Sequence, residues 1–525
     1  MSDITAPGEP AKPVPPGAEE RTGSDRASMY DVSVRSDVHF LHKNAVGLMG
    51  VLFLTVTGAA PISAMLFNTP ISVGWGNGIG TPAGFLFATV VLTIFSVGYC
   101  TMARKITAAG GFYSFISHGL GRELGMGFAF ASVAAYSVFE ASLAGGFAYF
   151  ANLKFAQHGI NIRWFWFALA MVALIAVLTY FDVRLSARLL GIALICEVII
   201  LLVMDVGIFA QGGNHVTAAA INPVNAFKGF PDGGGLAAGA AGIGIFFAFW
   251  SWVGFEMAPN YAEESKDPKH IVPRAMYISV IGLGIFYVIT SWAAISGYHS
   301  LHDAAEVAQK NSAEFFFIPT KEFVGGFARD VMSYLIITGS FACGMAFHNT
   351  AARYFYSLGR ERVLPSVLGR THHQWKSPHV ATLTQSAIAA LIVLGFAIFA
   401  GTHDPAAQAY LQLYGLMAVM GVIIILAVQA VVSIAIWNYF RVNYPDEQHW
   451  WRTMLAPAIS FVAQAIVLYL LFKNLDFLGS GYHWANYLGP IDAVIFVVGL
   501  AGAFYWKKKD PKRFDAVGRL INEGI

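Results

Sequence analysis

Long apolar runs, separated by short polar segments, occupy most of the chain after residue 40. Each run holds about 20 residues, which as a helix spans the ~30 Å hydrocarbon core of a membrane. Only helices and closed barrels satisfy their backbone polar groups inside lipid, and these runs are too long for barrel strands. The pattern therefore predicts an all-α polytopic membrane protein with 12 transmembrane helices. The predicted spans are residues 44–68, 82–103, 125–151, 163–181, 188–210, 238–262, 275–297, 328–358, 379–401, 407–437, 453–473 and 486–506.

The first and sixth predicted spans contain residues that disfavour a continuous helix. The first includes Gly58-Ala59-Ala60-Pro61, and the sixth includes Gly254 followed by Pro259. Proline lacks the N–H group that a helix needs, and glycine tolerates unwound backbone. A single interrupted span fits a simple proline kink as well as a break. Two at corresponding positions of two five-span halves favour discontinuous helices, a pattern typical of transporters built from inverted repeats.

This pattern divides the chain into five segments. Residues 1–40 are low in hydrophobicity and contain Pro and Gly, so we expect a disordered cytoplasmic tail. Residues 41–212 hold helices 1–5 of the first repeat, and residues 213–440 hold helices 6–10 of the inverted second repeat. The last two helices lie within residues 441–506, and a basic cytoplasmic tail follows in residues 507–525.

Composition and charge agree with a membrane protein. The chain is 56% hydrophobic and only 12% charged, and its net charge of +2 gives no basic field for nucleic acid. With both termini inside the cell, 26 of the 33 Lys and Arg residues fall inside and 7 outside. Because positive residues concentrate in cytoplasmic loops, we expect cytoplasmic termini in a plasma (inner) membrane. We see no cleavable signal peptide near Met1.

Other motifs are mostly exclusions. Cys100, Cys196 and Cys343 are far apart in apolar runs, so we interpret them as small packing residues, not as disulfide or metal ligands. The sequence contains no phosphate-binding loop and no H-E-x-x-H motif, which disfavours an ATP-driven pump or a metalloenzyme. We therefore expect neither catalytic residues nor a bound cofactor or metal.

Four segments together resemble the amino acid–polyamine–organocation (APC) transporters. These are "WSWVGFE" at 250–256, "EESKDP" at 263–268, "VPRAM" at 272–276 and "GGFYSFISHGLGRELGMGFAF" at 110–130. The resemblance extends over roughly residues 40–475. It implies a LeuT-type fold, in which a 5+5 inverted repeat with discontinuous helices 1 and 6 is followed by two further helices.

Broken helices expose backbone groups at mid-membrane that suit an amino acid. N-terminal helix ends favour a carboxylate, and unwound carbonyls favour an ammonium group. The resemblance implies that the first break meets the carboxylate and that the backbone at 251–253 meets the amine. Pro61 departs from the family pattern because it cannot donate, which leaves room for an amine without a carboxylate. The substrate-binding candidates are Gly58, Ala59, Ala60, Ile62, Trp250, Ser251, Trp252 and Val253.

Two side chains at the sixth break have alternative interpretations. Trp250 resembles the tryptophan that caps substrate in the arginine/agmatine exchanger branch of the family, where it would contribute ~0.5–2 kcal/mol by stacking or cation–π contact. It could equally be a core packing residue. Glu256 could carry a coupling proton, because burial favours its neutral form. Alternatively, its carboxylate pins the loop through hydrogen bonds.

Further acidic residues lie inside the predicted spans. Glu197 aligns with a lysine of the bacterial cationic-amino-acid branch, and Glu140 lies in the middle of the third span. Intramembrane acids are functional candidates by default, so both join Glu256 as proton-coupling candidates, with buried hydrogen bonding as the alternative. Asp205 is nearer the predicted outer interface, and we expect it to snorkel towards water.

Three other features are weaker. His348 could titrate but is more commonly just hydrogen-bonded, and Tyr410 and Tyr414 could form an outer gate or merely mark the interface. The charged segment "EESKDPKH" is interpreted as a loop at the membrane boundary.

These observations predict a secondary active transporter that works by alternating access in the lipid bilayer. We expect a small-molecule substrate, first an amino acid and second a polyamine or monoamine. A proton gradient is the expected energy source, sodium is less expected, and symport is preferred to exchange. The alternatives from other classes are an ion channel and a membrane-embedded enzyme, and the sequence shows no nucleophile–base or metal constellation for the latter.

Overall fold

The structure is a computed structural model that describes residues 41, 44–107, 110–181, 183–231, 233–399, 404, 406–515 and 517–518, without the side chains of residues 183–186 and 406. The predicted disordered tail, residues 1–40, lies outside the described residues, as do residues 516 and 519–525 of the predicted basic tail. The described part belongs to one unit, residues 40–525.

Helices make up this unit, and the described residues contain no β-strand, only two isolated bridges. Eleven helical segments are long and apolar enough to cross a membrane by length and composition, and the predicted fourth span is a shorter apolar helix of 17 residues. The all-α polytopic prediction is therefore confirmed. The main helices of these spans are α2 (Leu48–Ala59), α5 (Thr81–Ala103), α7 (Arg122–Ala156), α8 (Trp164–Tyr180), α9 (Val183–Ala210), α10 (Ala241–Trp250), α11 (Pro268–Ser296), α14 (Gly326–Arg360), α15 (His379–Phe399), α16 (Met417–Asn443), α17 (Ala456–Lys473) and α19 (Leu488–Lys509).

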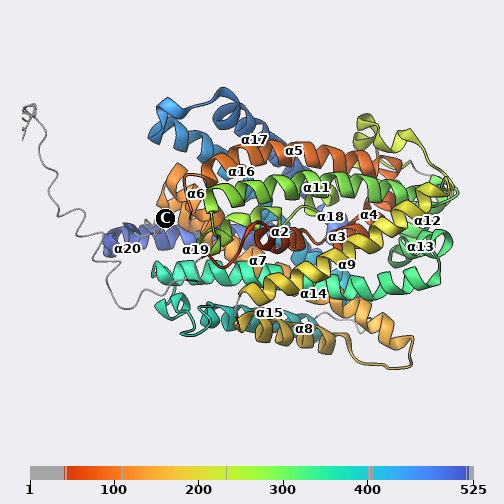
Figure 1. Cartoon of the computed structure of the whole chain (residues 1–525), viewed down its shortest axis with the longest axis horizontal. Helices are drawn as coiled ribbons and strands as arrows, with labels where there is room; N and C mark the ends of the chain where they lie inside the picture. Colours follow the sequence, from red (N-terminus) through yellow and green to blue (C-terminus); the bar gives the residue numbers. More distant parts are fainter. Residues whose placement is uncertain are drawn as a thin grey trace, which may run out of the picture. The chain divides into compact units, whose positions relative to one another are not determined.

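Shorter helices connect or extend these elements. They are α3 (Pro61–Ser63), α4 (Thr69–Ile71), α6 (Gly111–Leu120), α12 (Leu301–Lys310), α13 (Phe317–Phe323), α18 (Leu475–Leu478) and α20 (Pro511–Asp515). Figure 1 shows the long helices running side by side, with α7 and α14 packed together. In contrast, α15, α17 and α19 expose large apolar side chains such as Leu391, Ile466 and Val494, which suit contact with lipid.

The first span is broken where the sequence predicts it. Helix α2 ends at Ala59, and Ala60 adopts the left-handed conformation with φ 43°. Pro61 then starts α3, a position where its missing N–H costs no helix hydrogen bond. Helical backbone continues from there to Gly76, with two π-helical stretches.

The sixth span is broken in a different way. Helix α10 ends at Trp250, and Gly254 takes φ 118°, a value that glycine reaches most readily. The chain continues as η6 (Phe255–Glu264), a 3₁₀ helix that contains Pro259. Both predicted interruptions are thus present, while the division into two inverted five-helix repeats stays a prediction.

Candidate functional site

The two breaks touch each other through glycine backbone. A Cβ atom added to Gly254 would lie 2.6 Å from the carbonyl oxygen of Gly58 and 2.7 Å from the nitrogen of Ala59. One added to Gly58 would lie 3.3 Å from the Cα atom of Gly254. Only residues without a side chain permit this approach, so the glycines bring the unwound parts of both spans into one buried place.

Tyr287 of α11 joins the two breaks. Its hydroxyl lies 2.9 Å from the carbonyl oxygen of Ala59 and 3.1 Å from that of Ser251. A hydroxyl has one proton to donate, so it shares that proton between two acceptors. Sequence reasoning missed Tyr287 because it lies in an uninterrupted apolar run. The only signal was a tyrosine in the middle of a predicted span.

Asn68 also links the two broken spans. Its amide nitrogen lies 3.0 Å from the hydroxyl oxygen of Ser251, and that hydroxyl donates to the carbonyl oxygen of Phe247 at 2.8 Å. The amide oxygen of Asn68 is buried and has no hydrogen-bond partner among the residues that the structure describes. Asn68 lies two helical turns after the first break and was not among the sequence-based candidates.

The structure brings most of the predicted substrate-binding residues together. Gly58, Ala59, Ala60, Ile62, Ser251 and Val253 are buried around the two breaks. Trp252 is buried beside them, and its ring packs against Tyr287 and Phe85, with centroid distances of 4.9 and 6.0 Å.

Trp250 lies in a stack of aromatic rings on one side of the breaks. Its ring centroid is 5.6 Å from that of Tyr414, which in turn stacks on Tyr410 at 5.4 Å. Tyr149 of α7 continues the stack at 4.9 Å from Tyr410, and Phe67 packs 4.5 Å from Tyr414. Of the two tyrosines that the sequence suggested as gate residues, Tyr414 therefore stacks directly on Trp250, which is 9% exposed, and Tyr410 lies behind Tyr414.

Glu256 makes the contacts expected of a residue that holds the loop. One carboxylate oxygen accepts the backbone N–H of Gly254 at 2.8 Å, and the other accepts the hydroxyl of Tyr136 at 3.1 Å. The hydroxyl of Tyr99 approaches the carbonyl oxygen of Glu256 at 3.4 Å. These contacts fix the turn between α10 and η6, and they leave the proton-coupling interpretation untested.

Glu197 faces the first break from α9. The backbone N–H of Ile62 is directed at its carboxylate, but neither carboxylate oxygen has a partner with full hydrogen-bond geometry. Gly339 of α14 allows this approach, since a Cβ atom there would lie 3.0 Å from a carboxylate oxygen of Glu197. The fully buried carboxyl group of Glu197 therefore has little compensation for leaving water.

Glu140 and His348 form a buried pair away from the breaks. His348 Nδ1 lies 2.9 Å from a carboxylate oxygen of Glu140, and the side-chain amide of Gln385 donates to the same oxygen at 2.7 Å. Within the described part of the chain, the other carboxylate oxygen and His348 Nε2 have no hydrogen-bond partner. The sequence singled out both residues but gave no sign that α7, α14 and α15 bring them together.

Two expectations for single residues are wrong. Asp205 does not snorkel: its side chain is buried and accepts the hydroxyl of Thr290 on α11 at 2.7 Å. Its distance from the helix end predicted its depth, but not that it faces a neighbouring helix. Cys100 and Cys343 are buried as expected for packing residues, whereas Cys196 is exposed on α9.

Buried ion pairs hold one end of the helix bundle together. The described chain begins and finishes at this end. Arg353 binds Glu264 at 2.7 Å, and Arg360 binds Glu263 at 2.5 Å. Backbone bonds at 3.0 Å join Val46, before α2, to Glu264 and Lys266. The interpretation of "EESKDPKH" as a simple boundary loop is therefore wrong for its first two residues, which tie η6 to α14.

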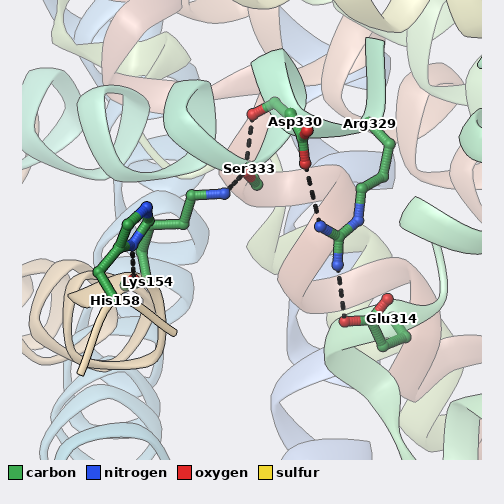
Figure 2. Close-up of polar contacts among 6 residues, drawn as sticks. All are labelled: Lys154, His158, Glu314, Arg329, Asp330 and Ser333. Carbon is green, nitrogen blue, oxygen red and sulfur yellow. Dashed lines mark hydrogen bonds and ion pairs between the residues drawn. The ribbon is translucent and has the colours of Figure 1, made fainter. Parts of the chain in front are cut away.

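The opposite end carries a more exposed polar network, drawn in Figure 2. Lys154 at the end of α7 donates to the hydroxyl of Ser333 on α14 at 3.0 Å. Arg329 bridges Asp330 at 3.1 Å and Glu314 at 3.5 Å. At this end, these contacts tie α7 to α14, and α14 to Glu314 before α13.

A family model described as amino acid permease matches residues 46–500. The chain belongs to this family. The permease is 22% identical over 318 residues to the low-affinity putrescine importer PlaP of Escherichia coli (strain K12), a match that covers 59% of this chain and 66% of that protein. It is 24% identical over 365 residues to the branched-chain amino acid permease BcaP of Bacillus subtilis (strain 168), covering 66% of this chain and 74% of that protein.

A third relative is the uncharacterized amino acid permease YecA of Bacillus subtilis (strain 168). The permease is 28% identical to it over 229 residues, which are 44% of this chain and 49% of that protein. The expected family is therefore confirmed, and membership of a permease family disfavours the enzyme alternative. The relatives' names cover both amino acids and an amine without a carboxylate.

Proposed function

We propose that this permease is a secondary active transporter that moves an amino acid or a related organic amine across the plasma membrane by alternating access. The observation that carries the proposal is the meeting of two broken helices at Gly58 and Gly254, both of which are buried in the helix bundle. Unwound backbone at this depth offers polar groups that continuous helices do not.

The backbone acceptors support a substrate with an ammonium group. The carbonyl oxygens of Ala59 and Ser251 converge on the single hydroxyl of Tyr287. An ammonium group has three N–H donors and a positive charge, so it satisfies two carbonyls better than one hydroxyl does. The substrate amine would therefore bind between these carbonyls, with Trp250 beside it.

One observation favours the second candidate, an amine without a carboxylate. At the first break the N–H of Ala60 bonds back to Val56 and Thr57, and Pro61 has none. The N–H of Ile62 is directed at Glu197. Few donors remain for a substrate carboxylate, which suits a polyamine or monoamine.

We propose the proton gradient as the energy source and symport as the mode of transport, with Glu197, Glu256 and Glu140 as the candidate proton carriers. All three carboxyl groups are buried, and Glu197 is the least compensated of them while facing the first break. Protonation of Glu197 would change the charge next to the substrate site.

We also propose that both termini are cytoplasmic, in line with the Lys and Arg distribution of the chain.

Substrate uptake into proteoliposomes tests the proposed function. Radiolabelled leucine, arginine and putrescine would be offered with and without an inward proton gradient, after a thermal-shift screen against amino acids and amines. We expect accumulation of at least one probe that depends on the gradient. Stabilisation and uptake of an unrelated solute alone would contradict the substrate class, and ion currents far above carrier rates would indicate a channel.

The variant Glu197→Gln tests the coupling separately. It removes the titratable group but keeps its shape, so binding should persist while gradient-driven accumulation is lost. The matched control is Asp205→Asn, since Asp205 is a buried acid on the same helix whose carboxylate is bonded to Thr290. Unchanged proton-driven accumulation in Glu197→Gln would remove Glu197 from the mechanism.

A further inference from the structure

The chain folds back on itself after the last long helix. Beyond Lys509 it forms α20 and then reaches Val517 and Gly518, and we call residues 511–515 and 517–518 the C-terminal strap. Phe514 and Val517 are buried, so the strap is seated by apolar contact. Figure 1 shows α20 at the same end of the bundle as α6, the end where α7 begins.

Charged groups fasten the strap to the first turn of α7. Arg122 forms an ion pair with Asp515 at 2.5 Å, and its guanidinium lies 5.6 Å from the ring centroid of Phe514. Lys507, which leads into the strap, pairs with Glu123 at 2.5 Å and approaches the same ring at 5.8 Å. The Phe514 ring thus has two cations beside it, each of which also binds an acid.

The end of the strap joins two further elements. A Cβ atom on Gly518 would lie 2.6 Å from that of Ser117 on α6, so the strap meets α6 in direct contact. The backbone of Gly518 also bonds to the carboxylate of Glu361, just past the end of α14. That carboxylate accepts the hydroxyl of Tyr113 on α6 at 2.9 Å. The strap therefore spans α6, α7 and the end of α14.

Helix α6 in turn contacts the second broken span. A Cβ atom on Gly111 would clash with the side-chain amide oxygen of Asn260 in η6. The next residue, Phe112, donates its N–H to the hydroxyl of Tyr354 on α14 at 3.3 Å. The element that the strap covers is thus packed against the half-helix that would have to move when this end opens.

We propose that the C-terminal strap locks this end of the permease closed and that it leaves its seat before the end opens. The inference rests on the alternating-access function proposed above. The strap's contacts exist only while α6, α7 and α14 keep their closed arrangement, so they stabilise that arrangement over any in which these elements separate. Undocking would then set the pace of opening, which makes the strap an autoinhibitory device.

Charge reversal across Arg122 and Asp515 tests this proposal. The background would carry Cys196→Ser, to remove the exposed thiol, and Val517→Cys, to report undocking. Native Cys343, whose thiol lies 3.4 Å from the carbonyl oxygen of Gly58, reports opening at the first break. Arg122→Asp and Asp515→Arg should each speed N-ethylmaleimide labelling of both thiols about two- to fivefold, the range expected for loss of a partly exposed ion pair.

Three further variants make the result decisive. The double variant Arg122→Asp/Asp515→Arg should return both labelling rates towards the starting values, which also shows that the variants fold. Lys310→Asp breaks an ion pair with Glu306 on α12 and should change neither rate. Phe514→Ala removes the buried ring and should speed both labelling reactions again.

Two outcomes would overturn the proposal. One is faster labelling of the residue 517 thiol with unchanged labelling of Cys343, because the strap would then undock without any effect on opening. The other is unchanged labelling of the residue 517 thiol in every variant. Neither readout needs a substrate, so a failed transport assay and a failed strap stay distinguishable.

Discussion

The side chain of Tyr287 contacts both unwound segments. Its hydroxyl serves carbonyls that belong to residues 59 and 251, almost 200 positions apart in the chain. When a buried carbonyl loses its hydrogen-bond donor, its desolvation penalty is no longer offset. The stability of the closed site should therefore depend on this hydroxyl until a substrate replaces it.

The variant Tyr287→Phe removes only the hydroxyl. We expect it to lower the free energy of unfolding by about 1–3 kcal/mol without substrate. A substrate amine should restore more stability to this variant than to the parent chain, since it supplies the missing donors. Thermal unfolding with and without putrescine or leucine measures both effects. Tyr277→Phe, on the same helix, is the matched control, and an equal loss there would contradict the assigned role.

Glu361 makes stability depend on pH at the strap. Burial raises the pKa of its carboxyl to about 8, although the Tyr113 hydroxyl and the Gly518 backbone act in the opposite direction. Because this pKa lies above the value in the unfolded chain, the contribution of Glu361 to the free energy of unfolding is complete below about pH 4.5. That contribution is lost as the pH rises towards 8. Each rise of one pH unit in that window lowers the free energy of unfolding by at most about 1.4 kcal/mol.

Glu361→Gln should remove this dependence. Relative to the parent chain, its melting temperature should rise steadily from pH 5 to pH 8 and then stay level, because glutamine takes up no proton. Melting curves across this range measure the difference. Glu306→Gln, an exposed residue on α12, should run parallel to the parent chain throughout, and a parallel curve for Glu361→Gln would show that Glu361 is ionised in the folded protein.

Sequence reasoning singled out residues that are marked by their own chemistry and missed those that are defined by their partners. Buried acids such as Glu197 and Glu140 stand out in an apolar run. Tyr287 and Asn68 do not, because their partners are a backbone carbonyl and a hydroxyl in a distant segment. Asp205 was placed wrongly since depth along a helix does not determine which neighbour a side chain faces.

At the scale of elements, the two breaks use different solutions to one problem. The first places Ala60 in a left-handed conformation before Pro61, whereas the second uses Gly254 with η6 behind it. Glycine and proline have a local effect on backbone, so their positions predicted both breaks. The direct contact between the breaks was not predictable, because it depends on how α2 and α10 pack.

Gly254→Ala tests that contact. A left-handed φ already disfavours alanine, and the new methyl group would press on backbone atoms of Gly58 and Ala59, which cannot rotate away. We expect a loss of more than about 2 kcal/mol in the free energy of unfolding. Gly282→Ala on α11 should be neutral or stabilising by up to about 1 kcal/mol, as its Cβ would meet open space. Similar chemical denaturation of both variants would contradict the tight approach of the breaks.

At the scale of the whole molecule, the ion pairs at the two ends of the bundle differ in burial. The end with Glu263 and Glu264 has ion pairs that are almost fully buried, and the opposite end has the partly exposed pairs of Arg329. Removal of one partner from a buried pair costs about 3–5 kcal/mol, whereas exposed pairs contribute at most about 1 kcal/mol. The two ends should therefore respond very differently to the same type of change.

Arg353→Gln and Arg329→Gln are the matched pair for this prediction. The first removes the positive charge beside Glu264 and should destabilise the chain by about 3–5 kcal/mol. The second should cost no more than about 1 kcal/mol. Adding Glu264→Gln to the first variant should recover part of the loss, because no buried charge then remains at that position. Equal effects in thermal unfolding would show that burial does not distinguish the two ends.

Cys196 gives this molecule a built-in position for a spectroscopic probe. Of the three cysteines in the chain it is the exposed one, and it sits among Ile192, Ile195 and Ile199 on the outward face of α9. Its neighbour in sequence, Glu197, points inward to the first break. A nitroxide attached to the native thiol would thus travel with the backbone that carries the carboxylate, and its electron paramagnetic resonance spectrum would follow that helix during turnover without any engineered residue.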